Sequence, residues 1–261
     1  MSARTEQREK QILHAVLRHG KISVDEIALL TGASPASVRR DLSRLEERGL
    51  VNRTHGGAKV AGQTIYKPFR FDSSFYEREN RFAEEKRRIA MAAAELVGEC
   101  ETIALTAGTT TTQVARCIRH KNGIRIVTHA LNIGMELSVQ PGLDVTLVGG
   151  NLRWAGAFSL TGPMTIEAIA GFVMDKTFIG ACGVDAIKGV TTIEPEEAAV
   201  FRAFVRQSKD VILVADSSKI GMVSPAVICP LNRVSKIVTD NGIDPIALSG
   251  LRNAGVDVLV V

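Results

Sequence analysis

The strongest constraint on the fold is a regular alternation of short apolar runs with helical stretches from residue 101 to the end. Strand-length runs rich in Val and Ile occur at 101–107, 124–129, 144–150, 175–181, 210–216, 236–240 and 257–261. Stretches with apolar residues at helical spacing separate them, at 111–120, 131–139, 165–171, 196–208 and 245–253. Strands that are apolar on both faces and alternate with helices are typical of an open, mostly parallel sheet covered by helices. We therefore predict an α/β domain.

Ligands of such sheets bind at the carboxyl ends of the strands, which makes the residues that end these runs candidates for a binding site. The segment 105–116, LTAGTTTTQVAR, passes from a strand end straight into a helix, whose N-terminal amides favour an anion. Glycine allows a ligand close to the backbone, and a lysine at another strand end can supply a matching charge. The candidate ligand residues are Thr106, Ala107, Gly108, Thr109, Thr110, Thr111, His129, Gly149, Gly150, Gly183, Asp185, Asp216 and Lys219.

Each of these residues also has a simpler explanation. The threonine run can be a helix cap with a tight turn, Gly149-Gly150 a turn, His129 a capping residue and Lys219 a solvated lysine. Small or polar residues occur at several strand ends of one sheet, where a hydrophobic core would contain apolar ones. This convergence favours a binding site over the simpler explanations.

The first sixty residues have a different pattern, that of short capped helices. Apolar residues at helical spacing predict a first helix over 6–18. Ser23 and Glu26 form an S-x-x-E capping box ahead of a second, short helix that ends at Thr31-Gly32. Ser34 as N-cap and Pro35 at the first helical position begin a third helix. Two helices joined by a short turn that contains glycine are typical of a helix-turn-helix.

The third helix has the features of a DNA recognition helix. Val38, Leu42 and Leu45 define its buried side, and small and basic residues occupy the other. After it, residues 50–60 read as two short strands around His55-Gly56-Gly57, whose glycines we expect to supply the positive φ of a tight hairpin, or wing. The candidate DNA-binding residues are Ser34, Ala36, Ser37, Arg39, Arg40, Ser43, Arg44, Arg53, His55 and Lys59.

The charge of the chain supports this interpretation. Residues 1–60 carry eleven Lys and Arg against seven Asp and Glu, so the whole net charge of +4 lies in the first quarter of the chain. Such an asymmetry is expected of a module that faces a polyanion. The alternative is that Arg39, Arg40 and Arg44 form an ordinary solvated face.

Other classes of protein are disfavoured. No run approaches the ~18 apolar residues of a membrane span, and the first residues lack the apolar segment of a signal peptide, so we expect a cytoplasmic protein without a membrane partner. Cys100, Cys117, Cys182 and Cys229 lie far apart without a CxxC pair, which predicts buried free thiols rather than a zinc site or disulfides. No metal, cofactor or catalytic residue is expected.

These patterns predict a DNA-binding domain over 5–60, a linker over 61–78 and a ligand-binding domain over 79–261. The linker lacks a helical period and carries apolar residues that can dock on a neighbour, Tyr66, Phe69, Phe71 and Phe75. A helix over 80–97 follows it.

The segment SVDEIALLTGASPASVRRDLSRLEERGLVNRTHGGA resembles the winged helix-turn-helix of the DeoR family of bacterial transcriptional regulators, in particular at ASPASVRRDL, Gly49, Arg53 and His55-Gly56-Gly57-Ala58. The likeness continues through ALTAGTTTTQVA, VTLVGGNLR and VILVADSSKIG and covers nearly the whole chain. It implies a C-terminal sensor domain similar to the folds of phosphosugar isomerases and CoA-transferases. Such sensors are taken to bind phosphorylated sugars or related sugar acids and to release the operator.

Three positions depart from the family's pattern. Thr106 and Cys182 stand where the family usually has Asp, and His129 stands where it usually has Asn. The loss of two carboxylates removes candidates for acid–base chemistry and favours a more acidic ligand, to which a charged His129 could donate.

The resemblance and the residues together predict a repressor of a carbohydrate or sugar-acid operon. Its partners would be double-stranded operator DNA, an effector that is a phosphorylated sugar or sugar acid, and further copies of the chain in a dimer or tetramer. The alternative is an isomerase-like enzyme with an attached DNA-binding module, which would need a catalytic carboxylate near the threonine loop.

Overall fold

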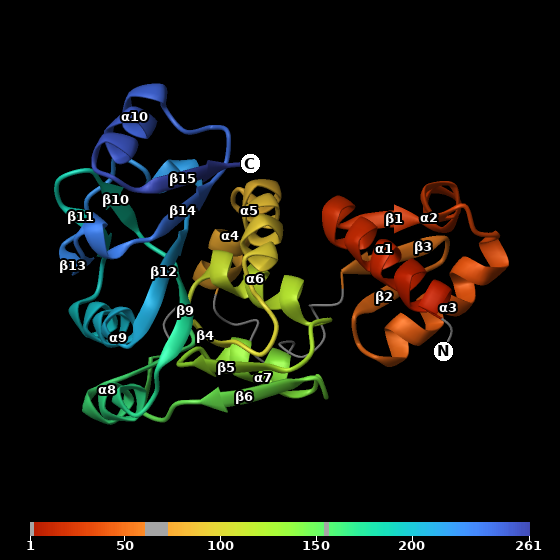
Figure 1. Ribbon diagram of the computed structural model, residues 1–261, viewed down its shortest axis with the longest axis horizontal. Helices are drawn as coiled ribbons and strands as arrows, with labels where there is room; N and C mark the ends of the chain where they lie inside the picture. Colours follow the sequence, from red (N-terminus) through yellow and green to blue (C-terminus); the bar gives the residue numbers. More distant parts are fainter. Residues whose placement is uncertain (1–2, 61–72, 154–156) are drawn as a thin grey trace. The chain divides into compact units, whose positions relative to one another are not determined.

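The computed structural model describes residues 3–60, 73–153 and 157–261, which are drawn as ribbons in Figure 1. The chain forms two compact units, Met1–Lys67 and Pro68–Val261, and each is described by itself. The linker residues expected to dock on a neighbour, Tyr66, Phe69 and Phe71, lie outside the described residues.

The N-terminal unit is a three-helix module with a small sheet, which confirms the predicted helix-turn-helix and wing. Its elements are α1 (Ala3–His19), β1 (Lys21–Ser23), α2 (Val24–Thr31), α3 (Pro35–Glu47), β2 (Val51–Thr54) and β3 (Gly57–Val60). The capping box at the start of α2 forms, since Ser23 and Glu26 bond to each other's backbone amides. Strand β1 was not predicted, because three residues are too few for a pattern.

The three helices of this unit share one apolar core. Ile12 and Val16 of α1, Ile27 of α2, and Val38 and Leu42 of α3 are completely buried. Burial of such a side chain stabilises a fold by about 1.5–3 kcal/mol. Because the apolar side of α3 is buried in this core, the polar side of α3 faces solvent.

Of the two glycines of the wing, only Gly57 is required, and for a different reason from the one expected. Neither Gly56 nor Gly57 adopts a positive φ. Gly57 instead pairs with Ser23 of β1 and Thr54 of β2, and a Cβ on it would lie 2.0 Å from the carbonyl oxygen of Ile22. Glycine at 57 therefore lets β1 approach β3, whereas a Cβ on Gly56 would meet no atom within 4 Å.

The second unit is built on a parallel sheet of seven strands in the order β15-β14-β12-β9-β4-β5-β6 (Figure 1). The strands are β4 (Thr102–Leu105), β5 (Ile124–Thr128), β6 (Leu143–Leu147), β9 (Met174–Ile179), β12 (Ser208–Val214), β14 (Lys236–Thr239) and β15 (Asp257–Val260). Each of the seven apolar runs forms one of them, so the predicted α/β class is confirmed.

Helices and short antiparallel strands surround this sheet. The helices are α4 (Ser73–Asn80), α5 (Ala83–Glu95), α6 (Thr109–Ile118), α7 (Leu131–Ser138), α8 (Pro163–Ala170), α9 (Pro195–Arg206) and α10 (Pro245–Asn253), with 3-10 turns η2 (Ser217–Lys219) and η3 (Leu231–Arg233). The added strands are β7 (Asn151–Arg153), β8 (Ser159–Thr161), β10 (Gly183–Asp185), β11 (Gly189–Thr192) and β13 (Ala226–Cys229). Helix α4 lies where the sequence predicts a linker without helical period.

The order of the strands defines a switch point between β4 and β9. From β4 the chain moves outward to β5 and β6, whereas from β9 it moves the opposite way to β12, β14 and β15. The connections after β4 and β9 therefore part at the carboxyl edge, which leaves a crevice there in sheets of this type.

The cysteines correct one expectation. Cys117 and Cys229 are buried, but Cys182 is half-buried and Cys100 is exposed. No cluster of metal-ligating side chains occurs among the described residues. Within the same ranges, no helix has the length and apolar character needed to cross a bilayer.

Candidate functional site

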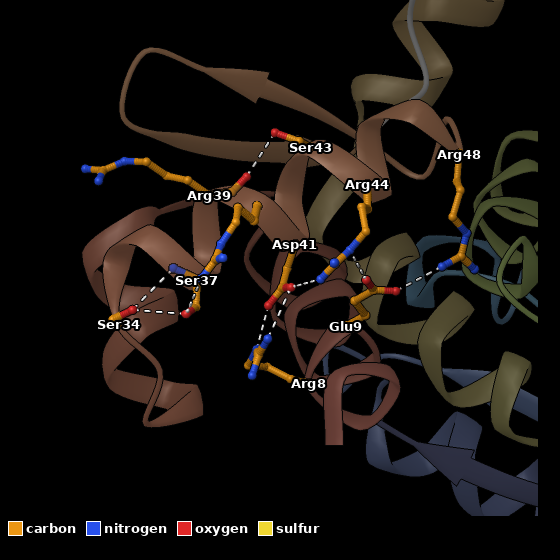
Figure 2. A network of polar contacts seen from close by, with 10 residues as sticks. Arg8, Glu9, Ser34, Ser37, Arg39, Asp41, Ser43, Arg44 and Arg48 are labelled. Carbon is orange, nitrogen blue, oxygen red and sulfur yellow. Dashed lines mark hydrogen bonds and ion pairs between the residues drawn. The ribbon is translucent and has the colours of Figure 1, made fainter. Parts of the chain in front are cut away.

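The N-terminal half of α3 presents small and basic side chains to solvent. Ser34 caps the helix by accepting a 3.3 Å hydrogen bond from the amide of Ser37, and Ala36 beside it is exposed. Arg39 and Arg40 are also exposed, and Figure 2 shows Arg39 extended away from the rest of the unit. This surface has the shape and charge to enter a DNA groove.

Arg44 has a different environment from Arg39 and Arg40. It donates to Glu9 of α1 at 2.9 Å and to Asp41, and both carboxylates are buried (Figure 2). Arg8 also donates to Asp41 at 2.5 Å, and Arg48 donates to Glu9 at 3.1 Å. Arg44 therefore has a structural role, because it connects α3 to α1. The predicted contact of Arg44 with phosphate would be a second role.

The wing is attached to α3 by its own basic residue. Arg53 donates to the hydroxyl of Ser43 at 3.0 Å, and its backbone amide donates to Glu46 at 2.9 Å. His55 and Lys59 are exposed on the same hairpin. The predicted DNA-binding residues of helix and wing thus belong to one connected structure.

A cavity of about 220 Å³ lies at the switch point of the large sheet. The ends of strands β4, β9, β11 and β12 contribute to it, together with residues of helices α4, α5, α6 and α9. The lining residues are Phe75, Arg78, Arg81, Phe82, Lys86, Ala107, Gly108, Thr109, Thr110, Ala157, Gly180, Ala181, Cys182, Thr192, Glu197, Phe201, Ala215, Asp216 and Lys219.

Six of the predicted ligand residues line the cavity: Ala107, Gly108, Thr109, Thr110, Asp216 and Lys219. The threonine run divides into two pairs. Thr109 and Thr110 border the cavity, whereas Thr111 and Thr112 donate to the carbonyl of Gly108 at 3.0 and 2.7 Å. No threonine side chain among the described residues caps the amides of α6, so the capping explanation is not confirmed, and the contact of Thr109 and Thr110 with a ligand stays a prediction.

The other predicted ligand residues do not line the cavity. The Thr106 hydroxyl accepts from the amide of Gly180 at 3.3 Å and so joins the ends of β4 and β9. Asp185 accepts from two amides of its own turn, which lowers its pKa. Gly149 accepts from the Thr165 hydroxyl, and Cβ atoms on Gly150 and Gly183 would lie 1.9 Å from Thr165 and 2.5 Å from Met222. Gly150 and Gly183 therefore serve close packing.

His129 is also outside the cavity lining, and it is fully buried. Its ring lies 5.5 and 5.4 Å from the rings of Phe201 and Phe204, and neither nitrogen has a hydrogen-bond partner among the residues that the structure describes. Burial lowers the pKa of His129 to about 3. The expectation of a charged His129 that donates to an anion is therefore wrong for this structure, in which the ring is neutral.

The cavity includes basic residues that the strand-end rule cannot find. Arg78, Arg81 and Lys86 come from α4, the turn after it and α5, and with Lys219 they face two acidic residues, Asp216 and Glu197. Their segment reads as the end of a linker and the start of a helix, and nothing in its local pattern indicates that it packs on a strand end. The excess of positive charge favours an anionic ligand.

Comparison with protein families gives two matches. Residues 8–64 match the family described as the DeoR-like helix-turn-helix domain. Residues 81–241 match the DeoR C terminal sensor domain.

Two curated relatives match along most of their length. The HTH-type transcriptional repressor GlcR of Bacillus subtilis is 32% identical over 98% of this chain and 96% of its own. The glycerol-3-phosphate regulon repressor of Escherichia coli is 31% identical over 90% of each chain. Both are named as repressors and neither as an enzyme, in agreement with the predicted regulator.

Among solved structures, ribose 5-phosphate isomerase A from Neisseria gonorrhoeae is 18% identical over 55% of this chain and 54% of its own, with a TM-score of 0.38. That likeness is distant, and no inference about function rests on it.

Proposed function

The chain belongs to the DeoR family of transcriptional regulators, and from this premise we propose that it is a repressor of an operon for carbohydrate or sugar-acid catabolism. The N-terminal unit binds operator DNA. A phosphorylated sugar or sugar acid binds in the cavity of the second unit and lowers the affinity of the protein for the operator.

The proposed DNA contact is made by the outward side of α3 and by the wing. Arg39 and Arg40 are exposed beside the small residue Ala36, which allows the helix backbone to come close to the groove floor. Arg53, His55 and Lys59 lie on the wing and serve phosphate contacts, whose strength falls as salt rises. One such module is small, so we propose that at least two copies of the chain bind a repeated operator.

The observation that carries the effector assignment is the basic cavity at the start of α6. Amides at the N-terminus of a helix lack partners within the helix and favour an anion. Thr109 and Thr110 add hydroxyls to this end, and the Lys219 ammonium comes from the end of β12. A phosphate group fits this combination of donors.

The remaining walls suit the rest of such a ligand. Asp216 offers a carboxylate as an acceptor for sugar hydroxyls. Arg78 and Arg81 are exposed at the cavity and can pair with a second anionic group, such as the carboxylate of a sugar acid. The relative named for the glycerol-3-phosphate regulon supports a phosphorylated metabolite as the signal.

The test is a titration of the full-length protein onto DNA from its own upstream region, followed by fluorescence anisotropy. Each of a panel of sugar phosphates and phosphorylated and unphosphorylated sugar acids is then added. We expect at least one phosphorylated compound to weaken the complex by about 5- to 150-fold, the usual range of coupling between two sites. Specific DNA binding that no member of the panel changes would contradict the effector assignment and leave the DNA assignment standing.

A further inference from the structure

Lys86 is a buried ammonium group that lies on the wall of the cavity. It belongs to the first turn of α5 and is only 4% exposed. Its Nζ donates to the backbone carbonyl of Arg81 at 2.6 Å and to that of Arg78. Both carbonyls lie at the end of α4, where helical carbonyls have no partner within their own helix.

This contact closes the corner between α4 and α5. Phe82 separates the two helices in the left-handed conformation with φ 56°, and the amide of Lys86 donates to its carbonyl at 3.0 Å. The corner therefore depends on Lys86 twice, through its backbone and through its ammonium group.

The partners of the ammonium are poor ones for a buried charge. Among the described residues, neutral carbonyls accept two of its three N–H groups. Burial lowers the pKa of Lys86, while the nearby charge of Asp216 raises it. Opposite charges attract each other, and the attraction is stronger away from bulk water, so an anion in the cavity would be a better acceptor than the neutral carbonyls.

Helix α4 is also in contact with the helix that begins at the cavity. Glu79 of α4 pairs with Arg116 of α6 at 2.6 Å, and Arg116 pairs with Glu136 of α7 at 3.0 Å. The ring of Phe75 on α4 lies 5.0 Å from that of Phe158. Among the described residues, α4 is the first helix of the second unit, so a change in α4 occurs at the start of that unit in sequence.

We propose that Lys86 is an effector-binding residue that reports the bound anion to α4. The anion takes a hydrogen bond from the Lys86 ammonium, the carbonyls of Arg78 and Arg81 lose theirs, and the end of α4 loosens. This inference rests on the proposed anionic effector. It adds the residue that couples binding in the cavity to a change in α4.

The test is hydrogen–deuterium exchange of the α4 amides in the full-length protein, with and without inorganic phosphate as the probe. Binding of phosphate is followed separately by calorimetry. In the unsubstituted protein, we expect saturating phosphate to speed exchange at the end of α4 by about fivefold or more, the lower end of common couplings between two sites. Phosphate that binds without changing this exchange would overturn the proposal, as would a failure of phosphate to bind.

Two variants distinguish the coupling of Lys86 to α4 from the binding of phosphate in the cavity. Lys86→Met keeps the length of the side chain without its charge, and we expect fast α4 exchange that no longer responds to phosphate. Lys219→Met removes a charge from the other wall, and we expect slow exchange that also fails to respond because phosphate binds weakly. Slow exchange in Lys86→Met would show that the ammonium does not hold α4 and would also overturn the proposal.

The exchange experiment is independent of the operator. If no sugar phosphate releases the operator but phosphate loosens α4, the proposed release of the operator by an effector fails and the role of Lys86 stands. If a sugar phosphate releases the operator and α4 exchange stays constant, the proposed release by an effector stands and the role of Lys86 fails. Should Lys86→Met fail to fold, the phosphate response of the unsubstituted protein decides alone, and Lys86→Arg is expected to preserve it in part because its charge is kept.

Discussion

Arg44 of α3 donates a 2.9 Å hydrogen bond to Glu9 of α1, so a basic residue on the polar side of α3 ties that helix to the first one. Replacement by Ala would leave the buried carboxylates of Glu9 and Asp41 with one arginine each, Arg48 and Arg8.

For Arg44→Ala we therefore expect the N-terminal unit to lose about 1–3 kcal/mol of unfolding free energy, less than for a fully buried pair because Arg44 is 38% exposed. Thermal unfolding of this unit in the full-length protein measures the loss. Arg39→Ala, which removes an exposed charge from the same helix, should change stability by less than about 0.5 kcal/mol. Equal stability of the two variants would contradict the structural role of Arg44.

Arg40→Ala is expected to weaken operator binding without unfolding the unit. The Arg40 side chain is exposed and donates a 3.4 Å hydrogen bond to the hydroxyl of Ser37. Loss of an arginine that contacts a base costs about 1–3 kcal/mol, or roughly 5- to 150-fold in affinity. Anisotropy at fixed salt measures the change, and Arg206→Ala in the second unit is the control with the same loss of charge. If both variants bind alike, Arg40 does not read the operator.

Gly57→Ala and Gly56→Ala should differ sharply although the residues are neighbours. The new Cβ at 57 would lie 2.0 Å from a backbone oxygen, which must move, whereas at 56 it would meet open space. We expect Gly57→Ala to cost the N-terminal unit about 3 kcal/mol or more and Gly56→Ala less than about 1 kcal/mol. Circular dichroism melting compares them, and a similar loss in both would disprove the close approach of β1 to β3.

Lys219→Ala should leave the affinity for the operator unchanged and make release by the effector less sensitive. Lys219 lines the cavity in the second unit, so its loss removes one donor to the proposed anion and leaves the DNA-binding surface unchanged. We expect the effector concentration for half release to rise about 10-fold or more, because one charge-assisted hydrogen bond is worth roughly 1.5–3 kcal/mol. Lys188→Ala, at an exposed lysine outside the lining, is the matched control. Unchanged induction would exclude Lys219 as an effector contact.

His129 predicts a loss of stability in acid. Its pKa is about 3 in the folded chain against about 6.5 when unfolded, so between these values the unfolded chain binds a proton that the folded one does not. The folded state accordingly loses about 2 kcal/mol as pH falls from about 6.5 to about 5. His129→Leu, which has nearly the same volume, should remove this part of the pH dependence. Calorimetry of both proteins at the two pH values tests it, and parallel losses would show that His129 does not titrate this way.

The large sheet could be predicted from sequence because each of its strands is an apolar run set off by a helix. The short strands β7, β8, β10, β11 and β13 were not predicted, because they do not alternate with helices along the chain as the strands of the large sheet do. Strand-end reasoning found Thr109, Thr110, Asp216 and Lys219, which the sheet topology itself brings together. It could not place Lys86, whose position depends on how α4 and α5 pack. It also took His129 for a ligand residue, since a strand end does not show which side of the sheet a side chain faces.

The position of β9 in the sheet has a consequence for synthesis on the ribosome. Strand β9 pairs with β4 on one side and β12 on the other, so the two halves of the sheet join only after residue 179 has left the exit tunnel. The described helices and strands of the N-terminal unit, in contrast, all end by residue 60. Because domains commonly fold as they emerge, this unit is expected to be complete while the sheet is still being made. A nascent chain would then complete its DNA-binding unit before the unit that carries the proposed effector cavity.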